Sequence, residues 1–312
     1  MTAFVHRSRL VDVPGATLEV TECTAAGEAP DALALCLHGF PEHAHSWRHQ
    51  LEPLAGAGYR VWAPNLRGYG NSSRPPRMRD YAIEHLLGDV AGLIDAAAPA
   101  RTVLVAHDWG AVVAWYFAMR RIRPLEALAI LNVPHPEPAA REVRVNPRQR
   151  ASSWYVFFFQ LPVLPELMLG ARRAEGIVRM FTEGSAKPGA ISVENAEVFA
   201  RNVRQPGAPK AMVDYYRALV FGGGSRRQQR LGHPMIDVPT LLLWGEQDVA
   251  LRKATTWGTE RWVDPLTIRY LPEASHWVQQ DEPELVNEML LAFLRGDEVP
   301  HAPGARGDRD PH

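Results

Sequence analysis

The chain has 312 residues, enough to bury one large core or a core with an inserted segment. Hydrophobic residues make up 46% and charged residues 22%, as in a soluble globular enzyme. The net charge of −1 gives no argument for nucleic acid or an anionic membrane as a partner. The two cysteines, Cys23 and Cys36, do not form a disulfide framework, and the first residues lack the apolar core of a signal peptide. We therefore expect a cytoplasmic protein.

Short apolar runs alternate with helical patterns along most of the chain. In chain order, strands are expected at 17–23, 33–37, 60–63, 102–105, 127–131, 240–244 and 266–271. Helices are expected near 85–97, 111–121 and 283–294, the last with its apolar residues on one face. This alternation predicts an α/β protein whose mostly parallel central sheet is flanked by helices.

The alternation stops after residue 131. From about 136 to 233 the pattern is helical, interrupted by prolines, and contains no strong strand candidate. We predict a core domain formed by residues 1–135 and 234–295, with residues 136–233 folded over it as a helical cap. Residues 296–312 are polar and rich in Gly, Pro and charge, so this tail is expected to be disordered.

Asp108 lies between an apolar strand and a helical segment, with the small residues Ala106 and Gly110 two positions away on either side. That spacing suits a sharp turn whose central side chain points outward, where many hydrolases carry a serine. An aspartate, with a reference pKa of roughly 3.9, is an anion at neutral pH and attacks a saturated carbon to form an ester. This favours epoxides or alkyl halides as substrates. A helix N-cap is the alternative role for the same residue.

An acid and a histidine follow two later strands. Asp248 ends the turn after 240–244, and His276 lies in the loop after 266–271. Ligands of open α/β sheets bind at the carboxyl ends of the strands, so we expect these side chains to meet Asp108 there. The prediction is a nucleophile, Asp108, a base, His276, and an acid that orients the base, Asp248. Taken singly, Asp248 would be a turn residue and His276 a surface residue.

The turn after strand 33–37 brings a backbone N–H group to the same edge. The N–H groups of Phe40 and Trp109 are predicted to form an oxyanion hole when water attacks the ester on Asp108. A plain strand–loop turn is the alternative.

Six motifs along the predicted core carry these residues: HGFPE (38–42), RGYGNS (67–72), HDWGA (107–111), NVPHP (132–136), GEQD (245–248) and ASHW (274–277). Together they resemble the epoxide hydrolase branch of the α/β-hydrolase fold. The resemblance implies that fold, with a helical cap inserted after the sixth strand and the triad in the order nucleophile, acid, histidine. HDWG is shared with haloalkane dehalogenases, so this motif alone leaves the substrate open.

The resemblance also implies two cap tyrosines that protonate the opening epoxide oxygen. Residues 153–162 are similar to the family's first tyrosine segment and match it at Tyr155. Residues 213–217 are similar to the second and match it at Tyr216, with Tyr215 as the neighbouring alternative. Each tyrosine has a structural alternative as a core aromatic.

The residue at position 40 helps to distinguish epoxide hydrolysis from dehalogenation. Dehalogenases that resemble this chain commonly carry Asn at that position, where it donates to the halide, and Phe40 has no such donor. We therefore expect an epoxide hydrolase that produces a vicinal diol. A haloalkane dehalogenase is the second hypothesis, and a non-catalytic ligand-binding protein of the same fold is the third.

The remaining predictions concern the pocket and the partners. The substrate pocket is expected to be lined by the aromatic residues Trp109, Trp154, Phe158 and Trp277. The sequence has neither metal-ligand spacing nor a Gly-rich phosphate loop, so we expect no metal and no cofactor. The expected partner is a small-molecule epoxide, with no nucleic acid and no membrane span. A homodimer is compatible with the sequence, which does not fix the oligomeric state. A basic run is expected to form a solvated surface: Arg141, Arg144, Arg148 and Arg150.

Overall fold

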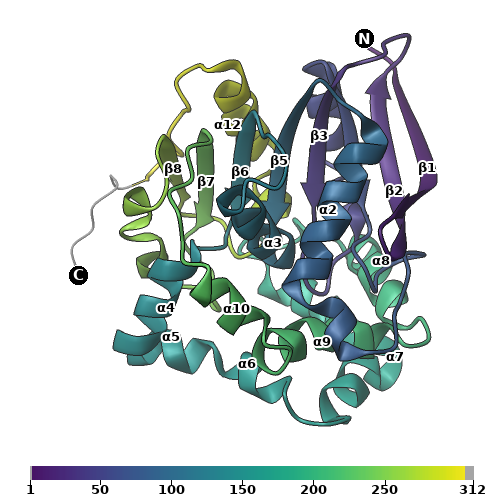
Figure 1. Cartoon of the computed structure of the whole chain (residues 1–312), viewed down its shortest axis with the longest axis vertical. Helices are drawn as coiled ribbons and strands as arrows, with labels where there is room; N and C mark the ends of the chain where they lie inside the picture. The colour runs from purple at the N-terminus through teal and green to yellow at the C-terminus, as the bar shows by residue number, and fades with distance from the viewer. Residues whose placement is uncertain (1, 306–312) are drawn as a thin grey trace.

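An eight-stranded sheet forms the centre of the computed structural model, which describes residues 2–305 (Figure 1). The strands lie in the order β1-β2-β4-β3-β5-β6-β7-β8. Their bounds are β1 (Phe4–Val13), β2 (Ala16–Ala25), β3 (Ala32–Leu37), β4 (Tyr59–Pro64), β5 (Arg101–His107), β6 (Ala127–Leu131), β7 (Thr240–Gly245) and β8 (Leu266–Leu271). From β4 to β8 neighbouring strands are parallel, whereas β1 and β2 add to one edge in antiparallel pairing. The predicted mostly parallel sheet is confirmed.

Helices cover both faces of the sheet. One face packs against α2 (Ile83–Ala97) and α3 (Asp108–Met119), and the other against α1 (Leu51–Gly56) and α12 (Pro283–Arg295). Successive side chains of β5 join these two clusters alternately, because neighbouring residues of a strand point to opposite faces. The central strands are therefore apolar on both sides, as expected for a covered parallel sheet.

A second group of helices connects β6 to β7 in the chain. These are α4 (Pro136–Val145), α5 (Pro147–Ser152), α6 (Trp154–Phe158), α7 (Leu164–Gly184), α8 (Val193–Val203), α9 (Ala208–Val220) and α10 (Gly224–Arg230). Figure 1 shows them gathered beneath one end of the sheet. Tyr216 of α9 packs on Phe40 and Trp109, which follow β3 and β5, so this is the carboxyl end of the parallel strands. We call α4–α10 and their connections, residues 136–233, the cap.

Short helical segments fill several loops. They are η1 (Ala44–Trp47), η2 (Met78–Tyr81), η3 (Lys253–Thr256), η4 (Thr259–Arg261) and α11 (Val278–Asp281).

Two segments differ from the sequence-based expectation. The strand β1 is missing from the predicted set because residues 6–10 are all exposed, so no apolar alternation identifies an edge strand. The expected disorder after residue 296 is wrong for residues 297–305. Val299 and Ala302 are buried there, and the Arg269 guanidinium on β8 donates to the carbonyl groups of Val299 and Pro300. Residues 306–312 of that predicted tail lie outside the described residues.

Candidate active site

Asp108 is the first residue of α3 and directly follows β5. The helix therefore begins three residues before the expected start at 111. The φ angle of Asp108 is +46°, in the left-handed region that few residues other than glycine adopt. Gly110 is required in the same turn, because a Cβ atom there would overlap with the backbone carbonyl of Leu37. The close approach of β3 and the strained backbone direct the carboxylate of Asp108 out of the strand end.

His276 lies between two carboxylates. Its Nδ1 is 2.6 Å from Oδ2 of Asp248, and its Nε2 is 3.6 Å from Oδ2 of Asp108. Asp248 is buried, and its Oδ1 accepts hydrogen bonds of 2.8 Å from two backbone N–H groups. The Asn132 side-chain amide donates to Oδ2 of Asp248 at 3.0 Å. These bonds hold Asp248 as an acceptor, so Nδ1 of His276 carries a proton and Nε2 is directed at Asp108.

The two carboxylates control the charge on His276. Burial lowers the pKa of His276, but the charges of Asp248 and Asp108 raise it more, and the net pKa lies well above its usual value. Burial raises the pKa of Asp108, but the hydrogen bond and charge of His276 lower it more, so the net pKa lies below its usual value. His276 therefore lies between two carboxylates that favour its charged form. Conversion of Asp108 to a neutral ester would remove one of the charges that raise the pKa of His276.

One of the two predicted oxyanion donors bonds the carboxylate of Asp108. The backbone N–H of Phe40 donates to Oδ1 of Asp108 at 2.6 Å. Gly39 permits this approach, because a Cβ atom at that position would overlap with the Asp108 side chain. Trp109 lies in the first turn of α3, where backbone N–H groups have no acceptor within the helix. The carboxylate therefore meets one donor directly and lies beside the N-terminus of a helix.

Tyr155 of α6 and Tyr216 of α9 lie above the carboxylate, with their ring centroids 6.0 Å apart. Burial raises the pKa of Tyr155, and the charges of Asp108 and Asp248 raise it further. Burial likewise raises the pKa of Tyr216, followed by the charges of Asp108 and Tyr155. The rings of Trp109 and Tyr216 pack edge to face with centroids 5.0 Å apart, and Trp109 partly offsets the rise in the pKa of Tyr216. Both phenols are therefore neutral donors close to the charge of Asp108.

Tyr215 has a different environment from its neighbour. Its hydroxyl donates to the backbone carbonyl of Arg67 at 2.7 Å, and its side chain is buried. Burial and Asp89 raise the pKa of Tyr215, with no contribution from Asp108. This geometry favours Tyr216 over Tyr215 as the second tyrosine of the site.

The predicted pocket aromatics occupy different environments. Trp109 and Trp277 are buried, and the Trp277 ring packs beside His276 with centroids 6.0 Å apart. Phe158 is half-buried. The prediction for Trp154 is wrong, because 62% of this residue is exposed and its ring packs against Phe158 of the same helix. The turn of the helix directs Tyr155 inward and Trp154 outward.

Three residues near the site were not predicted from the sequence to belong to it: Phe159, His107 and Glu42. Phe159 packs on Phe40 and Tyr216, with centroids 5.2 and 4.6 Å apart, and closes the apolar wall beside Asp108. His107 has Nδ1 at 2.7 Å from Glu42 Oε2 and Nε2 at 2.8 Å from the backbone carbonyl of His276. This buried pair connects the turn after β3 to the loop that carries His276. Glu42 belongs to the motif HGFPE and His107 to the motif HDWGA, but only the fold brings the two side chains together.

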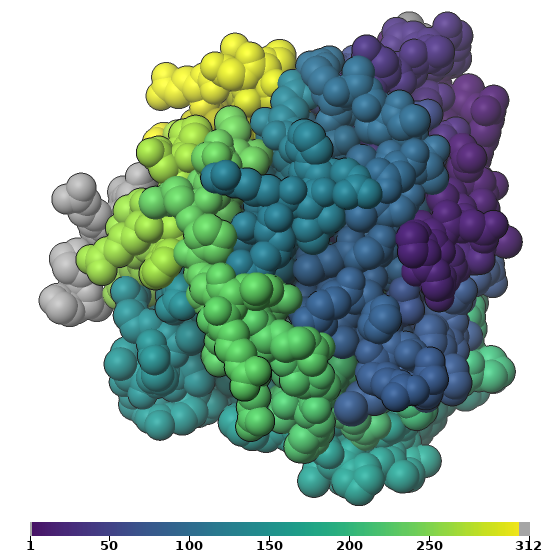
Figure 2. Space-filling view, viewed as in Figure 1, coloured from purple at the N-terminus to yellow at the C-terminus, as the bar shows by residue number. Residues whose placement is uncertain are grey.

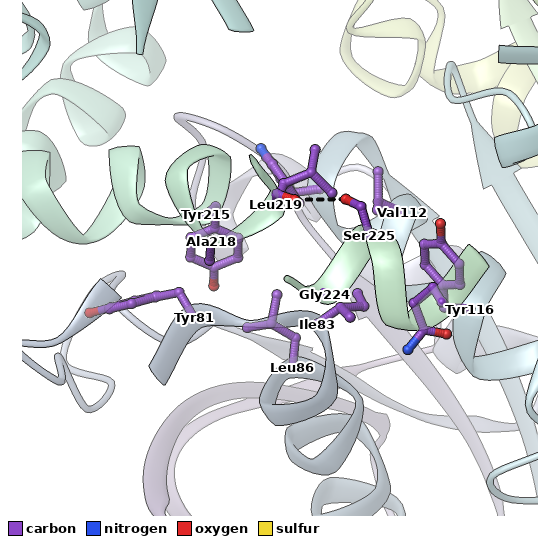
Figure 3. A pocket seen from close by; sticks show the side chains of 12 residues that line it. Tyr81, Ile83, Leu86, Val112, Tyr116, Tyr215, Ala218, Leu219, Gly224 and Ser225 are labelled. Atoms are coloured by element: carbon purple, nitrogen blue, oxygen red, sulfur yellow. Dashed lines mark hydrogen bonds between the residues drawn. The ribbon is translucent and has the colours of Figure 1, made fainter. Parts of the chain in front are cut away.

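A small apolar cavity lies behind Trp109 and Tyr215, between α2, α3, α9 and α10 (Figure 3). Its volume is about 10 Å³, room for about one water molecule. The Ser225 hydroxyl donates to the Leu219 carbonyl at its rim, at 2.7 Å. Asp108 does not line this cavity, so it is separate from the triad.

None of the helices within residues 2–305 combines the length and the apolar composition needed to cross a bilayer. In the same part of the chain, no group of three or more His, Cys, Asp or Glu side chains is arranged to hold a metal ion.

Comparisons with known proteins agree with this geometry. The family model of the alpha/beta hydrolase fold matches residues 35–283. The chain is 40% identical to epoxide hydrolase 3 of Xenopus tropicalis, over 89% of this chain and 75% of that protein. It is 33% identical to epoxide hydrolase A of Mycobacterium tuberculosis, over 93% of this chain and 98% of that protein. Among solved structures, it is similar to a Bacillus megaterium epoxide hydrolase in complex with an inhibitor, with a TM-score of 0.82, 29% identity, and coverage of 92% of this chain and 100% of that chain. It is also similar to epoxide hydrolase I of potato, Solanum tuberosum, with a TM-score of 0.80, 28% identity, and coverage of 94% and 100%.

Proposed function

The chain belongs to the epoxide hydrolases of the alpha/beta hydrolase fold, and we propose that it converts an epoxide and water to a vicinal diol through an ester on Asp108. The fold and the family predicted from the sequence are confirmed by this membership. The covalent route and the roles of the individual side chains are the proposal that follows.

In the first half-reaction, a carboxylate oxygen of Asp108 attacks one carbon of the epoxide ring. The carbon–oxygen bond breaks, and the oxygen takes a proton from the phenol of Tyr155 or Tyr216. The raised pKa values of both tyrosines support this role, because each phenol keeps its proton until negative charge develops on the substrate. When the ring opens, the epoxide oxygen leaves as a strongly basic alkoxide, and an acid is required to protonate it.

Esterification removes the negative charge of Asp108, so the pKa of His276 falls. The imidazolium then gives its proton to the tyrosine that protonated the substrate, which restores the phenol. In the second half-reaction, the neutral His276 removes a proton from water, and the resulting hydroxide attacks the ester carbonyl of Asp108. The protonated ring then returns this proton to the departing diol oxygen, and the carboxylic acid left at Asp108 passes its proton to His276, which restores the starting charges. The N–H groups of Phe40 and Trp109 stabilise the oxyanion formed between these steps.

One observation carries this proposal: Nε2 of His276 is 3.6 Å from the Asp108 carboxylate, while the charge of that carboxylate raises the pKa of both tyrosines. The charge of one carboxylate therefore acts on an imidazole and on two phenols, the groups that a nucleophile, a base and two acids require. A non-catalytic binding protein has no use for this arrangement.

The test uses a variant that stops after the first half-reaction. His276→Ala retains the nucleophile but lacks the base, so one equivalent of epoxide is expected to remain bound. Intact-protein mass should rise by the mass of the epoxide, and peptide mapping should locate the adduct at Asp108. Asp108→Ala is the matched control and should acquire no adduct. An unmodified His276→Ala protein that still consumes epoxide would contradict the proposal.

The geometry gives no support to the haloalkane dehalogenase hypothesis. Phe40 offers no side-chain donor for a halide. We expect diol from aryl and alkyl epoxides, and no halide release from haloalkanes of matched size. The cytoplasmic location and the homodimer stay predictions from the sequence.

A further inference from the structure

The charge of the chain is distributed unevenly between the cap and the core. Residues 136–233 contain 15 Lys and Arg but 8 Asp and Glu, which gives the cap a net charge of +7. The whole chain has a net charge of −1, so the remaining residues carry −8. The total charge therefore gives no guide to what the cap binds, because it averages two oppositely charged parts.

The outer side of the cap also exposes large apolar side chains. They belong to α6, to the first turns of α7 and to the loop between these helices. Their exposed fractions are Trp154 62%, Phe157 68%, Val163 63%, Leu164 46%, Leu167 64% and Met168 58%. Figure 1 places α6 along the lower edge of the molecule, on the side away from the sheet, and Figure 2 shows teal cap side chains on that lower surface. We call these six side chains the apolar patch; exposed apolar side chains gathered on neighbouring segments indicate an interaction site.

Arginines flank the apolar patch on both sides along the chain. Arg148 and Arg150 precede it, and Arg172 and Arg173 follow it. All four are exposed, and none forms an ion pair within the part of the chain that the structure describes. Glu166 is the one acidic residue between positions 148 and 173. Its two carboxylate oxygens accept hydrogen bonds of 2.6 and 3.1 Å from the guanidinium group of Arg217 on α9, which compensates its charge. Along the chain, the apolar patch is therefore bordered on both sides by exposed positive residues.

We propose that the apolar patch and its flanking arginines bind the surface of an anionic lipid bilayer. Apolar side chains beside basic groups fit the boundary between acyl chains and headgroups, and guanidinium groups bond lipid phosphates. Such binding is peripheral and needs no spanning helix. The opposite side of α6 carries Tyr155 toward Asp108, so docking occupies only the outer side of that helix.

A second copy of this chain is the competing occupant of the patch. A two-fold interface would bring the same surface of both copies together. Each cap has a net charge of +7, so the flanking arginines of one copy would face those of the other. An anionic surface compensates this charge, whereas a second copy doubles it.

Co-sedimentation of the full chain with lipid vesicles tests the proposal. Vesicles of phosphatidylcholine with about one third phosphatidylglycerol should bind the protein, and vesicles of phosphatidylcholine alone should not. The triple variant Phe157→Ser, Leu164→Ser, Leu167→Ser and, separately, Arg172→Glu with Arg173→Glu should each bind roughly tenfold more weakly. The matched control is Leu10→Ser, which removes an apolar side chain that is 62% exposed on β1, and its binding should equal that of the parent. Salt at about 1 M, where the Debye length is about 3 Å, should also reduce binding.

Three results would overturn the proposal. The first is absence of binding to the anionic vesicles. The second is equal binding by the patch variants and the Leu10→Ser control. The third is a dimer in sedimentation velocity that the triple variant dissociates, which would assign the patch to a second copy. Vesicle binding is measured without substrate, so its outcome is independent of the reaction proposed at Asp108.

Discussion

Tyr215 and Tyr216 are neighbours on α9, but their hydroxyl groups lie in different parts of the molecule. Tyr215 donates to the buried carbonyl of Arg67, whereas Tyr216 lies among Trp109, Phe40 and Tyr155 near the nucleophile. Substitution of each tyrosine by Phe removes one hydroxyl and keeps the ring. The pair of variants therefore separates a structural hydroxyl from a catalytic one.

The magnitudes follow from what each hydroxyl bonds. A hydrogen bond to a charged group contributes about 1.5–3 kcal/mol. Since about 1.4 kcal/mol corresponds to a tenfold change in rate, Tyr216→Phe should slow ester formation by about 10- to 150-fold, with Tyr155 remaining as acid. Tyr215→Phe leaves a buried carbonyl without its donor, which should lower the free energy of unfolding by about 1–3 kcal/mol. It should leave the rate of ester formation unchanged.

Two measurements distinguish these outcomes. Single-turnover kinetics with protein in excess gives the rate of ester formation, and urea unfolding gives the stability of each variant. The expected pattern is a kinetic defect for Tyr216→Phe and a stability defect for Tyr215→Phe. A slow but stable Tyr215→Phe, together with a fully active Tyr216→Phe, would refute the assignment of the second acid.

Three further perturbations test other parts of the site. Asp108→Asn removes one of the charges that raise the pKa of His276, so an NMR titration of the ring should give a lower pKa than in the parent. The folded-state pKa of His276 lies above the unfolded value of about 6.5. The charge of His276 therefore stabilises the parent fully below about pH 6.5, and this stability is lost as the pH rises through the folded-state pKa. An NMR titration that is the same in Asp108→Asn and the parent would contradict the charge coupling. Arg217→Lys cannot reproduce the fork that bonds a carboxylate and two carbonyl groups of the α6–α7 connection, and it should lower the urea-unfolding free energy by about 1–3 kcal/mol. Gly110→Ala should destabilise the fold because its Cβ would meet the backbone, whereas Gly88→Ala on α2, with open space around it, should gain about 0.5–1 kcal/mol; equal unfolding curves would refute the packing argument.

The sequence was sufficient to predict that three side chains of the candidate site meet, because parallel strands end at one edge of the sheet. Asp108, Asp248 and His276 each follow a strand, and the structure brings them together around the imidazole. The choice between Tyr215 and Tyr216 could not be made from the sequence. Adjacent helical residues point about 100° apart, and only the packing of α9 decides which of them faces the nucleophile.

Other features depend on tertiary contacts that no local pattern contains. Trp154 is exposed although it neighbours Tyr155. The sequence could not show which side of α6 faces the core domain, because the helix is so short. The ordered chain around Val299 has a polar composition typical of disorder, and its contact with β8 was not predictable. The hydrogen bonds of His107 to Glu42 and to the loop of His276 join segments far apart in sequence.

Isotope tracing through the Asp108 carboxylate tests the ester most directly. With protein in excess of epoxide in water enriched in heavy oxygen, the diol from a single turnover should contain only ordinary oxygen, because its new hydroxyl comes from Asp108. After repeated turnovers, mass spectrometry should find heavy oxygen in the peptide that contains Asp108. A diol labelled in its first turnover, with no label in that peptide, would contradict the covalent mechanism.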